Sequence, residues 1–139
     1  MHPQHSGWAN ADIDTQLRTL RRRAVHMIGS LVASSDGLLI SYDLPPEIEP
    51  TSVAALAAAQ LSLSLRFVAT THGSDLSEVV MDGGYGQVVV YAAGPTASLT
   101  VLTDTEATLG RMHLDARPVS TAIASILAAQ TSLQESGPY

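Results

Sequence analysis

The chain has 139 residues, a formal net charge of −6 at pH 7 and no cysteine. This length fits one domain with enough residues for a core. The absence of cysteine excludes disulfides and cysteine-based zinc sites. The pI of about 5.1 argues against a general nucleic-acid binder and against a protein that binds anionic membranes.

The first sixteen residues, MHPQHSGWANADIDTQ, are polar, so we expect no signal peptide. No run of about 18 apolar residues without polar interruption is present, so we also expect no membrane insertion. Both points favour a cytoplasmic protein. We expect disordered tails at residues 1–10 and 134–139, around a single domain at residues 11–133.

The first helix is expected to start at a cap, Asp12 or Asp14, and to run to about Arg23. Its apolar side carries Ile13, Leu17 and Leu20. Four of the seven arginines lie in this helix: Arg18, Arg21, Arg22 and Arg23. We interpret them as partners of the negative helix C-terminus. The alternative is a dedicated site for a phosphate group or a partner protein.

Two apolar runs follow, at residues 25–34 and 38–42, separated by Ser35-Asp36-Gly37. An Asp-Gly step between apolar runs predicts a hairpin with a type I′ turn. The connection DLPPEIEP at residues 43–50 is rigid and acidic. Its prolines end the strand, and Thr51 or Ser52 is expected to cap the next helix.

The long helix is predicted at residues 51–71, TSVAALAAAQLSLSLRFVATT, and Gly73 is expected to end it. On a helical wheel its apolar residues form two opposite stripes. One stripe contains Ala54, Ala58, Leu61, Leu65 and Val68, and the other contains Leu56, Ala59, Leu63 and Phe67. A surface helix normally has one apolar stripe. We therefore predict that one stripe meets the sheet and the other meets a second copy; burial of both in a monomeric core is the alternative.

Three strands are predicted at residues 76–82, 86–93 and 97–104, joined by short turns that make neighbours antiparallel. A final helix is expected at residues 117–133. The predicted fold is therefore a mixed α/β (α+β) domain of three layers, with element order αββαβββα. Its five-stranded antiparallel sheet has the long helix on one face and the two terminal helices on the other.

Few residues suggest catalysis or metal binding. The five histidines lack the spacing of a metal site, so we expect no metal. Ser34-Ser35-Asp36 lies in no G-x-S-x-G motif and is interpreted as part of the turn. The glycines at 83, 84 and 86 match no phosphate-binding loop and are interpreted as a hairpin turn. We expect no enzyme activity and no cofactor.

The segments LVASSDGLLIS, AALAAAQLSLSLRF, EVVMDGGYGQVVVYAAG and ASLTVLTDTEATLGRMHLDAR occur in an order and spacing that resemble the Roadblock/dynein light chain superfamily. The resemblance covers about residues 25–127 and is greatest to bacterial, actinobacterial MglB-like members. It implies a five-stranded antiparallel sheet between helices. It also implies a homodimer formed through the central helix and the third strand, without a cofactor or a catalytic residue.

The family further implies a partner, a small Ras-like GTPase, and in some systems a sensor-kinase-like protein. The expected function is a homodimeric regulatory or scaffold protein that binds the GTPase and shifts its conformational population. The alternatives are a ligand-binding sensor module with a closed pocket and, more remotely, an enzyme. We predict that the dimer interface contains Ala54, Ala58, Leu61, Leu65, Val68, Glu78 and Val80. Leu56, Leu63 and Phe67 are then expected to face the sheet.

Overall fold

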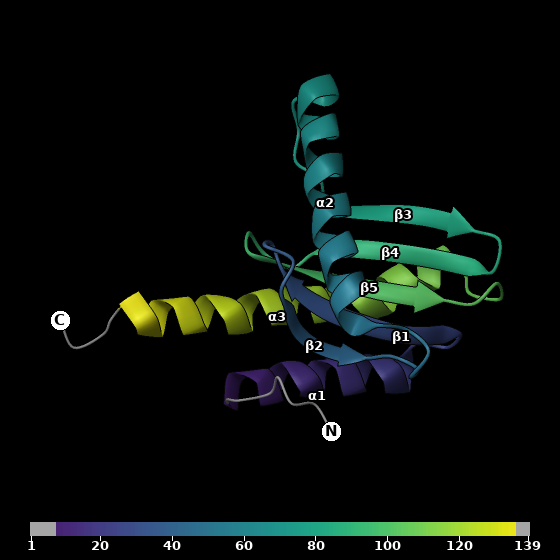
Figure 1. Ribbon diagram of the computed structural model, residues 1–139, viewed down its shortest axis with the longest axis horizontal. Helices are drawn as coiled ribbons and strands as arrows, with labels where there is room; N and C mark the ends of the chain where they lie inside the picture. The colour runs from purple at the N-terminus through teal and green to yellow at the C-terminus, as the bar shows by residue number, and fades with distance from the viewer. Residues whose placement is uncertain (1–7, 136–139) are drawn as a thin grey trace.

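The computed structural model describes residues 8–135, which form three helices and five strands (Figure 1). In chain order these elements are α1 (Trp8–Arg23), β1 (Met27–Ser34), β2 (Leu39–Asp43), α2 (Pro50–His72), β3 (Glu78–Gly83), β4 (Gly86–Ala92), β5 (Ala97–Thr103) and α3 (Leu109–Glu135). The predicted order of elements is confirmed.

The five strands form one antiparallel sheet in the order β2-β1-β5-β4-β3. Strand β5 is central and pairs with both β1 and β4. The β1–β2 hairpin lies on one side of it and the β3–β4 hairpin on the other. This arrangement leaves β2 and β3 at the edges. The predicted antiparallel fold with helices on both faces is confirmed (Figure 1).

One face of the sheet is covered by α1 and α3, which also pack against each other. The apolar side of α1 is buried as predicted, with Ile13, Leu17 and Leu20 at most 1% exposed. Strand residues Val32, Leu99, Tyr91, Val89 and Val101 and helix residues Met112, Ala116, Val119 and Ile123 complete this core. Successive side chains of β1, β5 and β4 point alternately toward this core and away from it, as in any pleated strand.

Of the helices in residues 8–135, only α2 crosses the other face. Ala54, Ala57 and Ala58 are the buried residues of this helix, and Ala54 packs against Leu31 and Ala33 of β1. Alanine is small enough to let a helix backbone lie close to a strand. The contact therefore fixes one end of α2 on the centre of the sheet.

Several boundaries differ from the sequence prediction. Helix α1 begins at Trp8 and α3 extends to Glu135, so both are longer than the predicted domain limits; residues 1–7 and 136–139 of the predicted tails lie outside the described residues. Helix α3 begins at Leu109, eight residues before the predicted start at residue 117, and Pro118 lies inside it. Proline in a helix interior removes one backbone hydrogen bond without necessarily ending the helix.

Two local predictions are corrected by backbone geometry. Only Gly37 has a positive φ in the β1–β2 turn, at 86°, whereas a type I′ turn needs positive φ at two residues. Helix α2 is capped by Glu49, whose carboxylate accepts hydrogen bonds from the Thr51 amide at 3.1 Å and the Thr51 hydroxyl at 2.8 Å. These hydrogen bonds lower the pKa of Glu49. The predicted cap at Gly73 is confirmed by its φ of 63° and its bond to Ala69.

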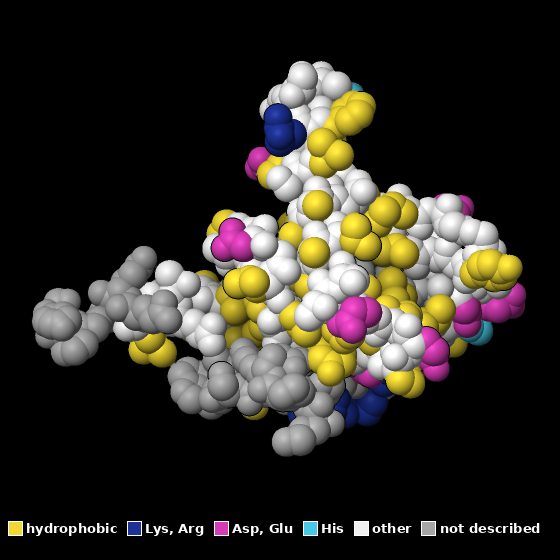
Figure 2. Space-filling model, in the orientation of Figure 1, with side chains coloured by type: hydrophobic (Ala, Val, Ile, Leu, Met, Phe, Trp, Pro, Cys, Tyr) yellow, Lys and Arg dark blue, Asp and Glu magenta, His cyan; other side chains and the backbone are white. Residues whose placement is uncertain are grey.

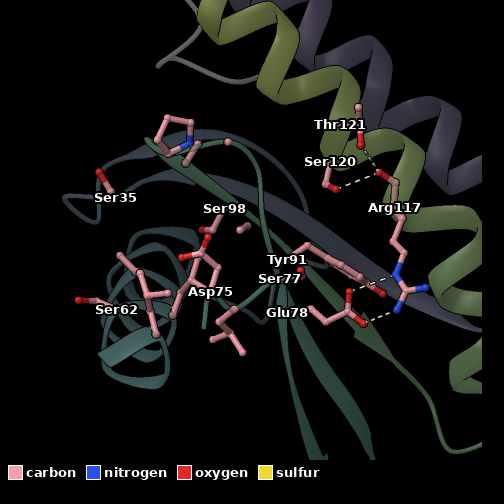
Figure 3. Close-up of a pocket in the computed structure, with 18 residues that line it drawn as sticks. Ser35, Ser62, Asp75, Ser77, Glu78, Tyr91, Ser98, Arg117, Ser120 and Thr121 are labelled. Carbon is pink, nitrogen blue, oxygen red and sulfur yellow. Dashed lines mark hydrogen bonds and ion pairs between the residues drawn. The ribbon is translucent and has the colours of Figure 1, made fainter. Parts of the chain in front are cut away.

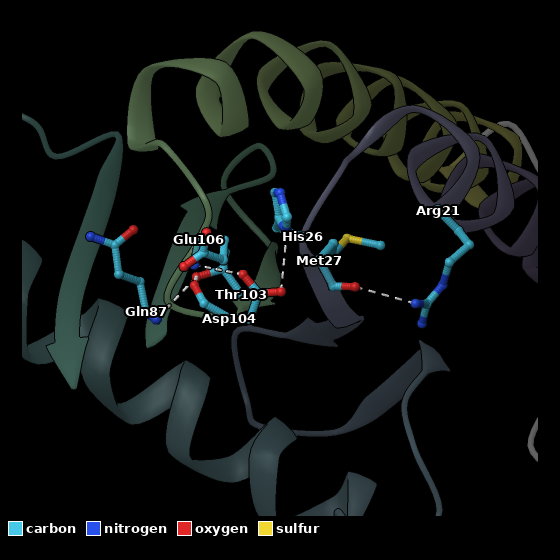
Figure 4. Close-up of polar contacts among 7 residues, drawn as sticks. All are labelled: Arg21, His26, Met27, Gln87, Thr103, Asp104 and Glu106. Atoms are coloured by element: carbon cyan, nitrogen blue, oxygen red, sulfur yellow. Dashed lines mark hydrogen bonds and ion pairs between the residues drawn. The ribbon is translucent and has the colours of Figure 1, made fainter. Parts of the chain in front are cut away.

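At the end of the sheet where β1 begins, polar contacts join segments distant in sequence (Figure 4). His26 has a φ of 69°, a conformation that is uncommon outside glycine. Its carbonyl accepts from the Asp104 amide at 3.0 Å, and its ring Nδ1 lies 3.2 Å from the Asp104 carboxylate. The backbone strain at His26 is therefore offset by two contacts that hold the start of β1 against the end of β5.

Strand β3 is an edge strand, and Glu78 ties its beginning to α3. The Arg117 guanidinium donates to the Glu78 carboxylate at 3.1 and 2.5 Å, and His113 Nε2 lies 3.2 Å from it. Tyr91 Oη lies 2.8 Å from His113 Nδ1. Burial raises the pKa of Tyr91. The His113 ring lies between the Tyr91 hydroxyl and the Glu78 carboxylate, with one ring nitrogen in contact with each.

We expect Gly86→Ala to destabilise the fold by about 2–4 kcal/mol. Gly86 has a φ of 140°, and an added Cβ would lie 2.0 Å from the Thr103 carbonyl oxygen. Gly84→Ala in the same hairpin is the control, because its Cβ would meet nothing within 4 Å. Urea unfolding of both variants measures the difference. Equal stabilities would show that the close approach of β4 to β5 does not constrain Gly86.

We expect Glu78→Gln to lower the free energy of unfolding at pH 7 by about 1–2 kcal/mol, because it removes a charged acceptor from Arg117 and His113. The Arg117 hydrogen bonds hold the pKa of Glu78 below 4.5 in the folded state. The ionic contribution is therefore present above the unfolded pKa and is lost as pH falls through the folded value. Urea unfolding at pH 7 and at a pH below the folded pKa of Glu78 measures the free energy of unfolding of wild type and variant. The two free energies should become equal in acid. A difference that stays constant with pH would contradict this role.

Candidate functional site

The most exposed apolar surface of the protein lies along α2. No residue from 61 to 72 is fully buried, and Figure 1 shows this part of the helix standing out beyond β3. Leu56, Leu63 and Phe67 are 70%, 62% and 68% exposed. Their spacing of seven and four residues places them on one stripe of the helix. Large apolar residues grouped in this way are typical of an interaction surface.

The apolar stripe of α2 continues onto the sheet beside it. Residues of β3 and β4 that share the sheet face of Leu31 are Val79, which pairs with Val90, and Met81, which pairs with Val88. Val79, Met81 and Val88 are only partly buried because α2 crosses near the beginning of β3 and leaves the rest of this face open (Figure 1). Figure 2 shows hydrophobic side chains beside α2 and near its tip.

We call this surface the α2–β3 surface and define it by Leu56, Leu63, Phe67, Val79, Met81 and Val88. Its strand part has an unpaired backbone edge, since β3 pairs only with β4 in the described sheet. Exposed edge groups are a template for another strand. The surface therefore combines apolar area with hydrogen-bonding capacity.

The structure reverses the predicted orientation of α2. Ala54 and Ala58, expected at the dimer interface, are 0% and 8% exposed and face the sheet. Leu61 and Val68 on the same stripe are partly buried, and Leu65 is 40% exposed. The argument that small residues allow close approach was sound, but they approach the sheet rather than a partner. The prediction that Leu56, Leu63 and Phe67 face the sheet is wrong, because all three point to solvent.

The two strand residues of the predicted interface lie on the opposite sheet face. Glu78 pairs with Tyr91 and Val80 pairs with Val89, and both partners belong to the core under α1 and α3. Glu78 is engaged by Arg117 and His113, and Val80 is 39% exposed. The sequence reasoning missed Val79 and Met81. A period-2 reading of β3 against the buried residues of β4 is the signal that could have found them.

By length and composition alone, α2 could cross a membrane, with 23 residues and a mean hydropathy of 1.5 over its best window. This differs from the sequence prediction, which counted uninterrupted apolar runs. The window is 11% buried in the described fold. Ala54, Ala57 and Ala58 pack on the sheet, and Arg66 lies in the outer half. These residues are consistent with a helix shared between a sheet and a second surface.

A groove of about 1030 Å³ lies on another side of α2, between that helix, the turn before β5 and α3 (Figure 3). Leu61 and Leu65 line one wall, and the joined side chains of Glu78 and Arg117 lie at the far end. The Ser98 hydroxyl lines it and has no hydrogen-bond partner among the described residues. The groove is open to solvent, whereas the hypothesis of a ligand sensor predicted a closed pocket.

Within residues 8–135, no group of three or more His, Asp or Glu side chains is placed to hold a metal ion. The glycines at 83 and 86 end β3 and begin β4. Ser35 and Asp36 form the β1–β2 turn. The sequence interpretation of both segments as turns is confirmed.

The fold and its sequence have relatives. The sequence profile described as the Roadblock/LC7 domain matches residues 14–103. Two uncharacterised proteins of Methanocaldococcus jannaschii, MJ0310 and MJ1340, are each 31% identical over 86 residues, which is 62% of this chain and 75% of theirs.

Solved structures agree. A Roadblock/LC7 domain from Streptomyces avermitilis is 26% identical with a TM-score of 0.76, over 83% of this chain and 97% of its own. Myxococcus xanthus MglB, 20% identical, has a TM-score of 0.79 over 89% and 93%. A structure described as MglB with tetrameric arrangement is also 20% identical with a TM-score of 0.79, over 92% and 95%. The chain belongs to the Roadblock/LC7 domain family.

Proposed function

We propose that this protein is a non-enzymatic homodimeric regulator that binds a small Ras-like GTPase in a bacterial signalling system. The observation that carries the proposal is the α2–β3 surface, which joins an exposed apolar helix stripe to an open strand edge. Membership of the Roadblock/LC7 family supports it. We place the protein in the cytoplasm, where such a GTPase acts, with a sensor-kinase-like protein as a further partner.

The form of the α2–β3 surface suits a two-fold dimer. An axis beside β3 brings the β3 edges of two copies together in antiparallel pairing, which extends the sheet across both. The same axis lays the outer half of each α2 over the open Met81 and Val88 face of the other copy. A two-fold contact of this kind uses the same patch on both copies and closes, so neither β3 edge is left free.

Energetics favour this arrangement. Full burial of a large apolar side chain contributes about 1.5–3 kcal/mol, and Leu56, Leu63 and Phe67 are each at least 62% exposed in one copy. Six such side chains in the dimer, with paired β3 edges, can exceed the entropic cost of association, which is of order 4–15 kcal/mol. The alternative of a membrane-spanning α2 would instead have to place Arg66 in the lipid or at its surface.

The dimer then acts on the GTPase by binding one of its conformations more tightly. Within residues 8–135 no group of side chains is placed to hold a metal ion, and in this proposal the groups that hydrolyse GTP are the partner's own. A ligand shifts a two-state equilibrium only by its differential affinity for the two states. If the competent conformer is populated at about 0.1–10%, binding raises its rate at most about 10- to 1,000-fold.

We expect Leu63→Glu/Phe67→Glu to convert the dimer to a monomer, because it places two charges in each apolar stripe at the contact. Sedimentation velocity or light scattering measures the mass, and far-ultraviolet circular dichroism checks the fold. A flotation assay of the wild-type protein with lipid vesicles tests the alternative that α2 spans a membrane.

Leu114→Glu is the matched control, since Leu114 is 73% exposed but lies on α3, on the other side of the sheet. It should leave the dimer intact. A dimer of unchanged dissociation constant in the double variant would show that the α2–β3 surface is not the interface.

We expect the wild-type protein to form a complex with the Ras-like GTPase encoded beside its gene and to raise its hydrolysis rate, by no more than about 1,000-fold. Calorimetry with the GTPase bound to a non-hydrolysable GTP analogue measures binding, and phosphate release measures turnover. Binding without faster hydrolysis would restrict the role to tethering. Neither binding nor a rate change would overturn the proposed function.

A further inference from the structure

The arginines of α1 form a row that the dimer and the fold leave unused. Helix α1 buries Ile13, Leu17 and Leu20, and Arg22 lies directly opposite this face, with Arg18 beside it. Arg18 and Arg22 are four residues apart, so they are neighbours along one helix face, with about 5–6 Å between their Cβ atoms. Figure 2 shows basic side chains gathered at the lower edge of the molecule, where α1 lies.

Arg21, Arg22 and Arg23 lie in the last turn of α1, where the sequence prediction placed cations near the negative helix end, but among the described residues only Arg21 also contacts another element. Arg21 donates to the Met27 carbonyl at 3.4 Å (Figure 4). It also donates to the Asp43 carboxylate at 2.8 Å and to the Ile28 carbonyl at 3.1 Å, which ties the end of α1 to β1 and β2. Within residues 8–135, Arg18, Arg22 and Arg23 are in no ion pair. In a chain of net charge −6, three unpaired cations on one helix are not explained by internal pairing.

A repeated hydroxyl contact braces the two outward arginines. Arg18 donates to the Thr15 hydroxyl at 3.0 Å, and Arg22 donates to the Thr19 hydroxyl at 3.5 Å. The T-x-x-R unit therefore occurs twice with a period of four residues. Each contact holds its guanidinium along the helix axis, and a side chain with fewer accessible rotamers loses less entropy when it binds.

We propose that the outward face of α1 docks an acidic helix of a partner protein, with Arg18 and Arg22 pairing with carboxylates spaced one helical turn apart. The planar guanidinium pairs with a carboxylate through two parallel hydrogen bonds, which suits this spacing. The net charge of −6 disfavours an anionic membrane or nucleic acid, whose dense phosphates would repel the rest of the chain.

A second copy of this chain does not supply the acidic helix. Among the described residues, the acidic residues of the helices are Asp12 and Asp14 in α1 and Asp115 and Glu135 in α3, and no two of them are four residues apart. The partner is therefore a different protein. Since α1 covers the sheet face opposite to α2, this docking leaves the α2–β3 surface available. The proposed docking on the outward face of α1 does not rest on the proposed GTPase regulation.

The test uses two labelled helical peptides of identical composition. One carries glutamates at every fourth position on a single face, and the other has them scrambled. We expect the full-length protein to bind the ordered peptide at least about tenfold more tightly at low salt, and to weaken as salt shortens the Debye length. Fluorescence anisotropy measures both titrations.

Arg18→Gln/Arg22→Gln should weaken binding of the ordered peptide about tenfold or more, while Arg66→Gln/Arg111→Gln, which removes the same charge from α2 and α3, should change it less than about twofold. Arg18→Lys/Arg22→Lys should weaken it partially, since lysine keeps the charge but not the fork. Circular dichroism checks the fold of each variant.

Absence of peptide binding, equal losses in the two glutamine pairs, or no preference for the ordered peptide would overturn the proposal. Binding to vesicles containing phosphatidylserine that depends on Arg18 and Arg22 would overturn it in favour of a membrane surface.

Discussion

The packing of Ala54 against Leu31 and Ala33 of β1 determines how the second sheet face is covered. Ala54, Ala57 and Ala58 bring the first half of α2 onto the centre of the sheet. A single helix laid across five strands cannot cover the whole face, and a helix of 23 residues is about 35 Å long. The outer half must therefore leave the sheet, and the β3–β4 face beside it must remain open. The interaction surface follows from this one packing arrangement.

The two faces of the sheet thus have different tasks. The face under α1 and α3 is a continuous core, in which Tyr91, Leu99 and Ile123 are at most 1% exposed. Polar contacts at both ends of the sheet stabilise this half, through Glu78 with Arg117 and through His26 with Asp104. The core under α1 and α3 supports the sheet. This support holds the apolar groups beside α2 at fixed positions, so the α2–β3 surface is pre-organised.

Much of the fold could be predicted from the sequence because its signals are local. Periodicity identified the buried side of α1, and Gly73 marked the end of α2. The identity of the sheet-facing stripe was predicted wrongly, because both stripes of α2 are apolar and a helical wheel has no reference direction. The small alanines allow close approach either to the sheet or to a second copy of the helix. Only the tertiary fold shows that they approach the sheet.

The candidate site was harder to predict than the fold. Placing Glu78 and Val80 at the interface required the register of β3, and a shift of one residue exchanges the two faces of a strand. The start of α3 was predicted eight residues too late, although the helix continues through Pro118. In each case a nonlocal contact decides what a local pattern leaves open.

The free outer half of α2 has a consequence for cooperativity. From Leu61 to His72 no residue is fully buried in one copy, so this segment relies on intrinsic helix propensity for its order. An isolated helical segment of about twelve residues is marginal in water. In the proposed dimer, the amide hydrogen exchange of this segment would depend on subunit concentration through mass action, while the exchange of β1 and β5 would report the stability of the single domain. One helix would then belong to two cooperative units, with the boundary near Ala58.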